Sequence, residues 1–139
     1  MLKHKSIFIL VLLALIAGAC NKDKDGDGTA VRDNYLGLWQ CDEFDQNQQL
    51  TSTFQVEIHA HGSNANNILI DNFNLLGQGY QAEASTSGTS LTILQQVIGS
   101  VSVSGSGYIT NQLSTIELAY NVDDGSGQPE SISATLTKI

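Results

Sequence analysis

The stretch Ile116-Glu117-Leu118-Ala119-Tyr120-Asn121-Val122 decides the fold of this chain. Its large apolar side chains fall at every second position. Successive side chains of a β-strand point to opposite faces of the sheet, so this pattern predicts a strand with one buried face and one face in water. Residues 54–60 and 131–137 repeat the pattern, and their predicted core-facing residues are Phe54, Val56, Ile58 and Ala60 in the first and Ile132, Ala134 and Leu136 in the second.

Similar runs fill the rest of the chain. From Asp33 onward there is one proline, Pro129, and no helical period. Short β-rich runs alternate with Gly, Asn, Asp and Ser, the residues typical of turns. We count eight such runs: 37–45, 52–60, 67–74, 79–86, 90–97, 100–109, 113–122 and 131–138.

Short connections and the lack of a long crossover predict an all-β, antiparallel, eight-stranded meander. Such a meander hides its edges by closing into a β-barrel, and a two-sheet β-sandwich is the alternative. A barrel this short can be filled by its own side chains. Large inward residues are expected at Phe44, Phe54, Phe73, Tyr80 and Tyr120.

The N-terminus has the layout of a secretion signal. Lys3 and Lys5 precede an apolar run from residue 7 to 17, and small residues lead to Cys20. The run is shorter than the roughly 20 residues that a membrane-spanning helix needs. We interpret residues 1–19 as a signal peptide and Cys20 as the lipidated first residue of the mature chain.

Two features of this region leave alternatives open. Ala17-Gly18-Ala19 also fits ordinary signal peptidase, which would release a protein without lipid. Residues 20–32 are expected to be a flexible acidic tether, although Asp23, Asp25 and Asp27 resemble the start of a calcium-binding EF-hand loop. Asn34 stands where such a loop needs its bidentate glutamate, which argues against calcium.

Composition limits the partners of the mature chain. Removing residues 1–19 changes the formal net charge from −8 to −10, because Lys3 and Lys5 are lost and no acid is. A protein this acidic is a poor partner for nucleic acid and is repelled by anionic lipid. Membrane attachment is therefore expected to depend on the acyl chains at Cys20.

The predicted first strand carries a family resemblance. Tyr35-Leu36-Gly37-Leu38-Trp39 resembles the G-x-W opening of lipocalins and fatty-acid-binding proteins. The resemblance implies that Gly37 bends the chain and that Trp39 plugs the barrel base under a cation, for which Lys138 is the candidate. The predicted barrel domain spans residues 33–139. Residues 35–139 more broadly resemble the small lipocalin-like lipoproteins of Bacteroidota-type bacteria, and Lys and Asp after Cys20 resemble their surface-export tag.

The same resemblance bears on Cys41. Those relatives often pair a first-strand cysteine with one in the last strand, whereas here Ile132 lies about where that partner would be. Cys41 has no partner once Cys20 is lipidated, and no His, Lys or Arg lies near it in sequence to activate it. We expect a buried, inert thiol.

One cluster could carry chemistry. Glu57, His59 and His61 share one face of a predicted strand, at a spacing that could hold Zn²⁺ or Cu²⁺. The competing interpretation is a polar outer face that runs into a turn. Asp42, Glu43 and Asp45 are expected to be solvated.

These observations lead to one main expectation with two alternatives. We expect no catalytic residues and no cofactor, and a lipid-anchored protein of the outer membrane that faces the outside and has a binding or structural role. A carrier of a small apolar ligand is the first alternative, with Ala82, Ala84 and Gly105 leaving internal space. A metal-dependent enzyme that uses His59 and His61 is the second.

Overall fold

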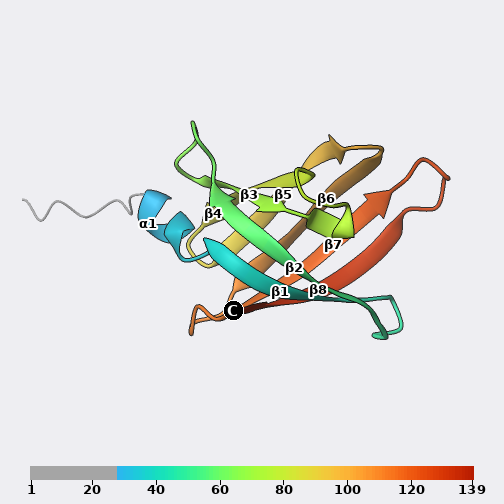
Figure 1. The fold of residues 1–139 in the computed structure, drawn as a ribbon, viewed down its shortest axis with the longest axis horizontal. Helices are drawn as coiled ribbons and strands as arrows, with labels where there is room; N and C mark the ends of the chain where they lie inside the picture. Colours follow the sequence, from blue (N-terminus) through green and yellow to red (C-terminus); the bar gives the residue numbers. More distant parts are fainter. Residues whose placement is uncertain (1–27) are drawn as a thin grey trace, which may run out of the picture.

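Eight antiparallel strands form a closed barrel in which each strand pairs with its neighbours in sequence and β8 pairs with β1 (Figure 1). The structure is a computed structural model and describes residues 28–139. The predicted meander barrel is confirmed, and the sandwich alternative is wrong. The elements are α1 (Gly28–Asp33), β1 (Gly37–Phe44), β2 (Leu50–Ala60), β3 (Asn67–Asp71), the 3₁₀ turn η1 (Phe73–Leu75), β4 (Gln81–Ser87), β5 (Ser90–Ile98), β6 (Val101–Ile109), β7 (Thr115–Asp123) and β8 (Glu130–Lys138).

Period-2 alternation places the core as predicted in most strands. In β7 the four large apolar residues at 116, 118, 120 and 122 are all buried, while Ala119 and Asn121 face water. In β2, Phe54, Val56 and Ile58 are buried, but Ala60 is exposed because β2 extends past its pairing with β1, which ends at Ile58. The alternation therefore identifies the inward residues of these strands, with the last residue of β2 as the exception.

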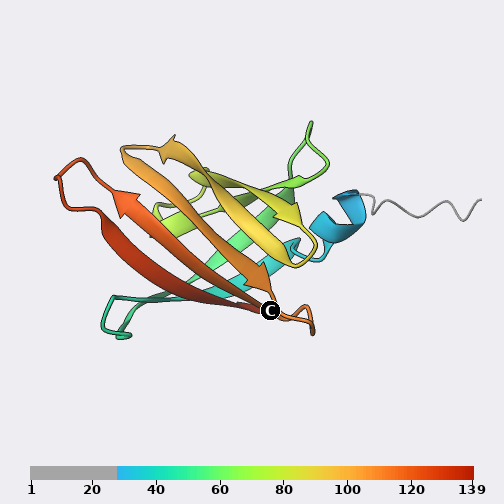
Figure 2. The same cartoon turned by 180° about the vertical axis from the view of Figure 1, so that it is seen from behind.

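The connections gather at two ends of the barrel (Figures 1 and 2). The Trp39 end carries α1, the connections 61–66, 88–89 and 110–114, and the last residue of β8. The Glu43 end carries the connections 45–49, 72–80, 99–100 and 124–129. Helix α1 falls within the predicted tether, where no helix was expected, and lies against β4.

Two glycines let β6 and β7 approach closely. A Cβ added to Gly105 would lie 2.5 Å from the carbonyl oxygen of Ala119, and one added to Gly107 would overlap the carbonyl oxygen of Glu117. Both glycines pair with inward residues of β7, Tyr120 and Leu118. The space expected at Gly105 is thus taken up by the neighbouring strand and leaves no room for a ligand.

The barrel interior is filled. Phe54, Phe73 and Tyr120 are buried as predicted, and Ala82 and Ala84 also face inward. A cavity of about 10 Å³ lies among core side chains that include Cys41, Phe73 and Tyr120, which is space for about one water molecule.

Two expected core residues lie elsewhere. Phe44 is only half-buried because Trp39, Cys41 and Glu43 hold the inward positions of β1 and the pairing with β2 shifts register between Glu43 and Phe44. Tyr80 is exposed because it precedes β4, in the turn after η1, where its ring lies over Gly99.

Candidate functional site

The expected anchor lies outside the described part of the chain. The signal peptide, Cys20 and the three tether aspartates all precede residue 28. Among residues 28–139, no helix is both long and apolar enough to cross a membrane. The lipidation of Cys20 therefore stays a prediction from the sequence.

Gly37, Trp39 and Lys138 come together at the Trp39 end. Gly37 has φ +117°, a conformation that side-chain-bearing residues rarely adopt. Trp39 is fully buried, and its indole N–H donates to the carbonyl oxygen of Tyr35 at 2.9 Å. Lys138 pairs with Trp39 in register, and its Nζ lies 5.1 Å from the centroid of the indole ring. The resemblance thus predicted a real cation–π contact, which closes the base of the barrel.

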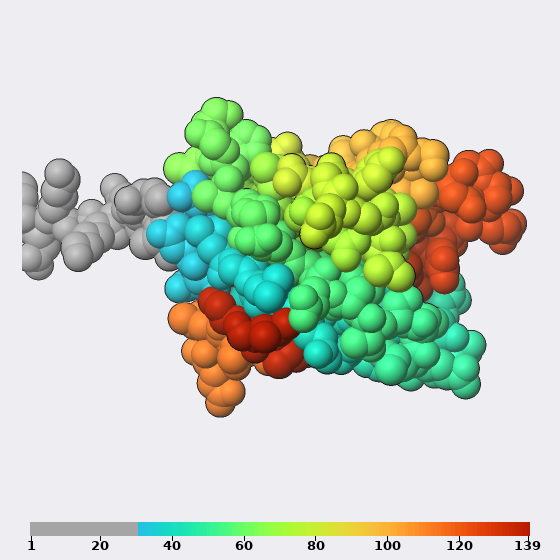
Figure 3. All heavy atoms as spheres, viewed as in Figure 1, coloured from blue at the N-terminus to red at the C-terminus, as the bar shows by residue number. Residues whose placement is uncertain are grey.

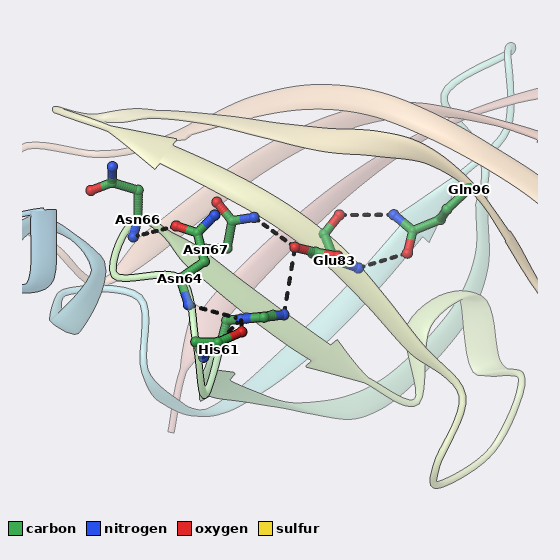
Figure 4. Close-up of polar contacts among 7 residues, drawn as sticks. His61, Asn64, Asn66, Asn67, Glu83 and Gln96 are labelled. Carbon is green, nitrogen blue, oxygen red and sulfur yellow. Dashed lines mark hydrogen bonds and ion pairs between the residues drawn. The ribbon is translucent and has the colours of Figure 1, made fainter.

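The two histidines lie beside different carboxylates and are not brought together with Glu57 as the metal-site alternative requires. His59 Nε2 lies 3.7 Å from Glu57 Oε2, and His61 Nε2 lies 3.7 Å from Glu83 on β4 instead (Figure 4). His61 leaves the common face because its Nδ1 accepts the backbone N–H groups of Ser63 and Asn64 in the turn after β2. Within residues 28–139, no group of three His, Cys, Asp or Glu is placed to hold a metal ion.

Glu83 is the centre of a structural network that uses both its carboxylate and its backbone (Figure 4). The side-chain amide of buried Asn67 donates to Glu83 Oε1 at 2.6 Å. Gln96 bonds both the N–H and the C=O of Glu83, at 2.8 Å each, beside the irregularity in the pairing of β5 with β6. These contacts fasten β3, β4 and β5 together at a point where regular ladder bonds are lost.

Glu43 is the residue that the sequence analysis misplaced. Its side chain is only 4% exposed and points into the barrel, whereas we expected it to be solvated. Tyr120 donates a hydrogen bond to Glu43 Oε1, and Asn74 Oδ1 lies 3.3 Å from the same tyrosine oxygen. Strand parity could have found it, because Trp39, Cys41 and Glu43 occupy alternate positions of β1.

The environment of Glu43 favours its neutral form. Burial raises the pKa of Glu43, the hydrogen bond from Tyr120 lowers it, and the charge of Glu130 raises it again. Burial and the negative charge of Glu43 raise the pKa of Tyr120. When Glu43 carries a proton it can donate to Tyr120, which can then donate to Asn74. The group can store a proton, but the adjoining cavity of about 10 Å³ has no room for a substrate.

Cys41 lies beside this cluster and is buried, as expected. Burial raises the pKa of its thiol, and the charges of Glu43 and Asp42 raise it further. Leu136 stands opposite Cys41 in the pairing of β1 with β8. The expectation that Ile132 occupies this place is wrong, since Ile132 pairs with Tyr120 of β7.

Two larger hollows open to solvent. One, of about 220 Å³, lies at the mouth of the barrel at the Glu43 end, where the inward side chains of Val101 and Val122 line it together with Asn74, Asp124 and Glu130. The other, of about 290 Å³, lies on the outer wall over Gly107 between β6 and β7, next to exposed Tyr108.

Comparison with known proteins supports the architecture. No protein-family model matches the chain, and no curated protein sequence matches it. A solved structure described as a redesigned β-barrel matches with a TM-score of 0.51 and 13% identity, covering 78% of this chain and 95% of that one. At this identity the likeness shows the fold alone: a small closed barrel.

Proposed function

We propose that this chain is a lipid-anchored protein of the outer membrane, displayed on the cell surface, whose barrel is a non-enzymatic binding or structural module. The observation that carries the second half of the proposal is the filled interior. A cavity of about 10 Å³ is far below the roughly 300 Å³ at which ligand pockets begin. Recognition by such a barrel takes place on its outer surface and its loops.

The anchoring half of the proposal is supported by the sequence. A basic start, a short apolar run and small residues before Cys20 resemble a lipoprotein signal peptide, although Ala17 stands where a branched apolar residue is usual. Acyl chains each contribute about 0.8 kcal/mol per buried CH₂, so a multiply acylated Cys20 would hold an acidic protein at a membrane.

The non-enzymatic half is supported by the site geometry. The buried carboxyl of Glu43 contacts Tyr120 and lines a space too small for a substrate. His59 and His61 are each held beside a different carboxylate on the outer wall. The carrier alternative gains nothing from Ala82, Ala84 or Gly105, because the surrounding side chains and strands fill the space beside them.

The test is metabolic labelling of the full-length chain in a bacterial host with radioactive palmitate. We expect label on the wild type, which should sediment with membranes, and none on Cys20→Ser, which should stay unprocessed or become soluble. A mature wild-type chain that carries no acyl mass would overturn the anchor and would favour cleavage by ordinary signal peptidase after Ala19. Accessibility of the protein to antibody on intact cells tests the surface location.

A further inference from the structure

Charge is distributed unequally between the two ends of the barrel. The two Lys and Arg residues of the described chain, Arg32 and Lys138, both lie at the Trp39 end. Asp33, which Arg32 contacts at 3.5 Å, lies at that end, and Glu57 stands on the adjoining wall opposite Leu38 in the pairing of β1 with β2. Besides the buried Glu43, the Glu43 end carries five carboxylates that reach the surface: Asp45, Asp71, Asp123, Asp124 and Glu130.

The Trp39 end also presents an apolar surface made of Leu38, Leu113 and Ile139, which are 41%, 39% and 64% exposed. The three lie close together, because Ile139 N–H bonds the carbonyl of Leu38 and Lys138 N–H bonds that of Ser114, next to Leu113. In Figure 3, α1, the 110–114 connection and the C-terminus gather at the same end. The Glu43 end also exposes apolar side chains, namely Leu50, Leu75, Tyr80 and Val97, but there they share the surface with the carboxylates.

We propose that the Trp39 end docks on the surface of the membrane that carries the Cys20 anchor, with Leu38, Leu113 and Ile139 at the headgroups and the carboxylates of the Glu43 end turned away. The inference rests on the proposed lipid anchor. The short link to the anchor points to the membrane as the docking partner. Eight peptide steps separate Cys20 from Gly28, and at about 3.5 Å per step they keep α1 within about 28 Å of the anchored residue.

Electrostatics favours the same orientation. A nine-residue strand is about 30 Å long, and at a barrel tilt of about 40° its ends are separated by about 23 Å along the axis. This separation exceeds the Debye length of about 8 Å at physiological salt. Carboxylates at the end far from the membrane therefore escape repulsion by anionic lipid, whereas carboxylates at the end that faces the membrane do not. The anchor keeps the protein at the surface, so weak contacts suffice to set its orientation.

The test uses the full lipidated protein in vesicles of four parts phosphatidylcholine to one part phosphatidylglycerol. Ile139→Cys and Val97→Cys, one at each end, are labelled with an environment-sensitive fluorophore; native Cys41 is buried and Cys20 is acylated. A phosphatidylcholine spin-labelled near the headgroup then quenches the label at position 139 roughly twofold more than the label at 97, because only the former reaches the interface.

Charge variants separate orientation from simple proximity. The double variant Asp124→Lys with Glu130→Lys should reduce the quenching difference, while Asp42→Lys with Glu117→Lys, both beside Thr135 on the barrel wall, should preserve it. Equal quenching of the two labels, or stronger quenching at position 97, overturns the docking proposal alone. A protein that fails to float with the vesicles overturns both the anchor and the docking.

Discussion

Glu43 is held inside the barrel with a hydrogen bond from Tyr120 and without a cation, since Arg32 and Lys138, the Lys and Arg residues of the described chain, lie at the other end. A buried carboxylate without a cation lowers the stability of the folded state, whereas a neutral carboxylic acid costs much less. The residue therefore links the stability of the fold to pH.

We expect Glu43→Gln to stabilise the protein at high pH. Burial raises the pKa of Glu43 above its usual 4.5, so the folded state holds this proton more tightly than the unfolded state. The free energy of unfolding of the wild type should therefore fall as the pH rises through the folded-state pKa. Glutamine never ionises, so the variant should lack that fall and be more stable by about 1–3 kcal/mol at pH 8. Urea unfolding from pH 4 to 8 measures this difference.

The matched control is Glu57→Gln, an exposed glutamate on the barrel wall, which should change stability by no more than about 0.5 kcal/mol at any pH. A wild type and a Glu43→Gln variant with parallel pH profiles would show that Glu43 does not titrate differently in the folded state.

Cys41 should react only when the barrel opens. Its thiol is buried and its pKa is raised, so the reactive thiolate is scarce in the folded state. In a Cys20→Ser chain, we expect thiol reagents to modify Cys41 at a rate that follows unfolding in urea. Val97→Cys, at a position that is 72% exposed, should react at once and serves as the control. Rapid modification of Cys41 in the native protein would contradict the expected inert thiol.

At the scale of elements, β6 depends on its glycines. In Gly107→Ala the new methyl group would overlap Glu117 O and lie 2.6 Å from Leu118 Cδ2, so β6 and β7 must separate. We expect a loss of about 1–3 kcal/mol, the usual cost of overpacking. Gly62→Ala is the control, because nothing lies within 4 Å of the added carbon. Thermal unfolding of both variants measures the effect, and equal stabilities would show that the strands do not need the close approach.

Sequence alternation predicted the eight strands because each must present one apolar face to a shared core. Alternation did not predict the ends of the strands correctly, because tertiary contacts there interrupt the regular inward–outward order of side chains. Residues 67–74 were expected to form one strand, but the chain leaves the sheet after Asp71, and Asn72, Asn74 and Leu75 adopt positive φ values in and around η1. That turn brings Asn74 to Tyr120 over the interior, a long-range contact that periodicity cannot reveal.

The candidate site was harder to predict than the fold. The contact of Trp39 with Lys138 could be anticipated from a resemblance that specifies both partners. The inward position of Glu43 was visible only in its alternation with Trp39 and Cys41 along β1, whereas an acidic segment such as Asp42, Glu43 and Asp45 is usually solvated. The His61 contact with Glu83 depends on the turn that follows β2, which sequence spacing does not define.

For the whole molecule, the filled interior makes a prediction about ligands. The wild-type protein, residues 28–139, should give a bare polypeptide mass in native mass spectrometry and should show no shift of its core methyl resonances with benzene. Leu136→Ala removes a side chain that is 1% exposed beside the small cavity, so it should cost about 2–5 kcal/mol and leave a dry apolar hole. Apolar holes of this kind accept benzene, so Leu136→Ala should bind it. The variant thus serves as the positive control for detecting a ligand in the core. If the wild type instead retains a bound apolar molecule, or binds benzene as the variant does, the carrier alternative would be supported over a filled barrel.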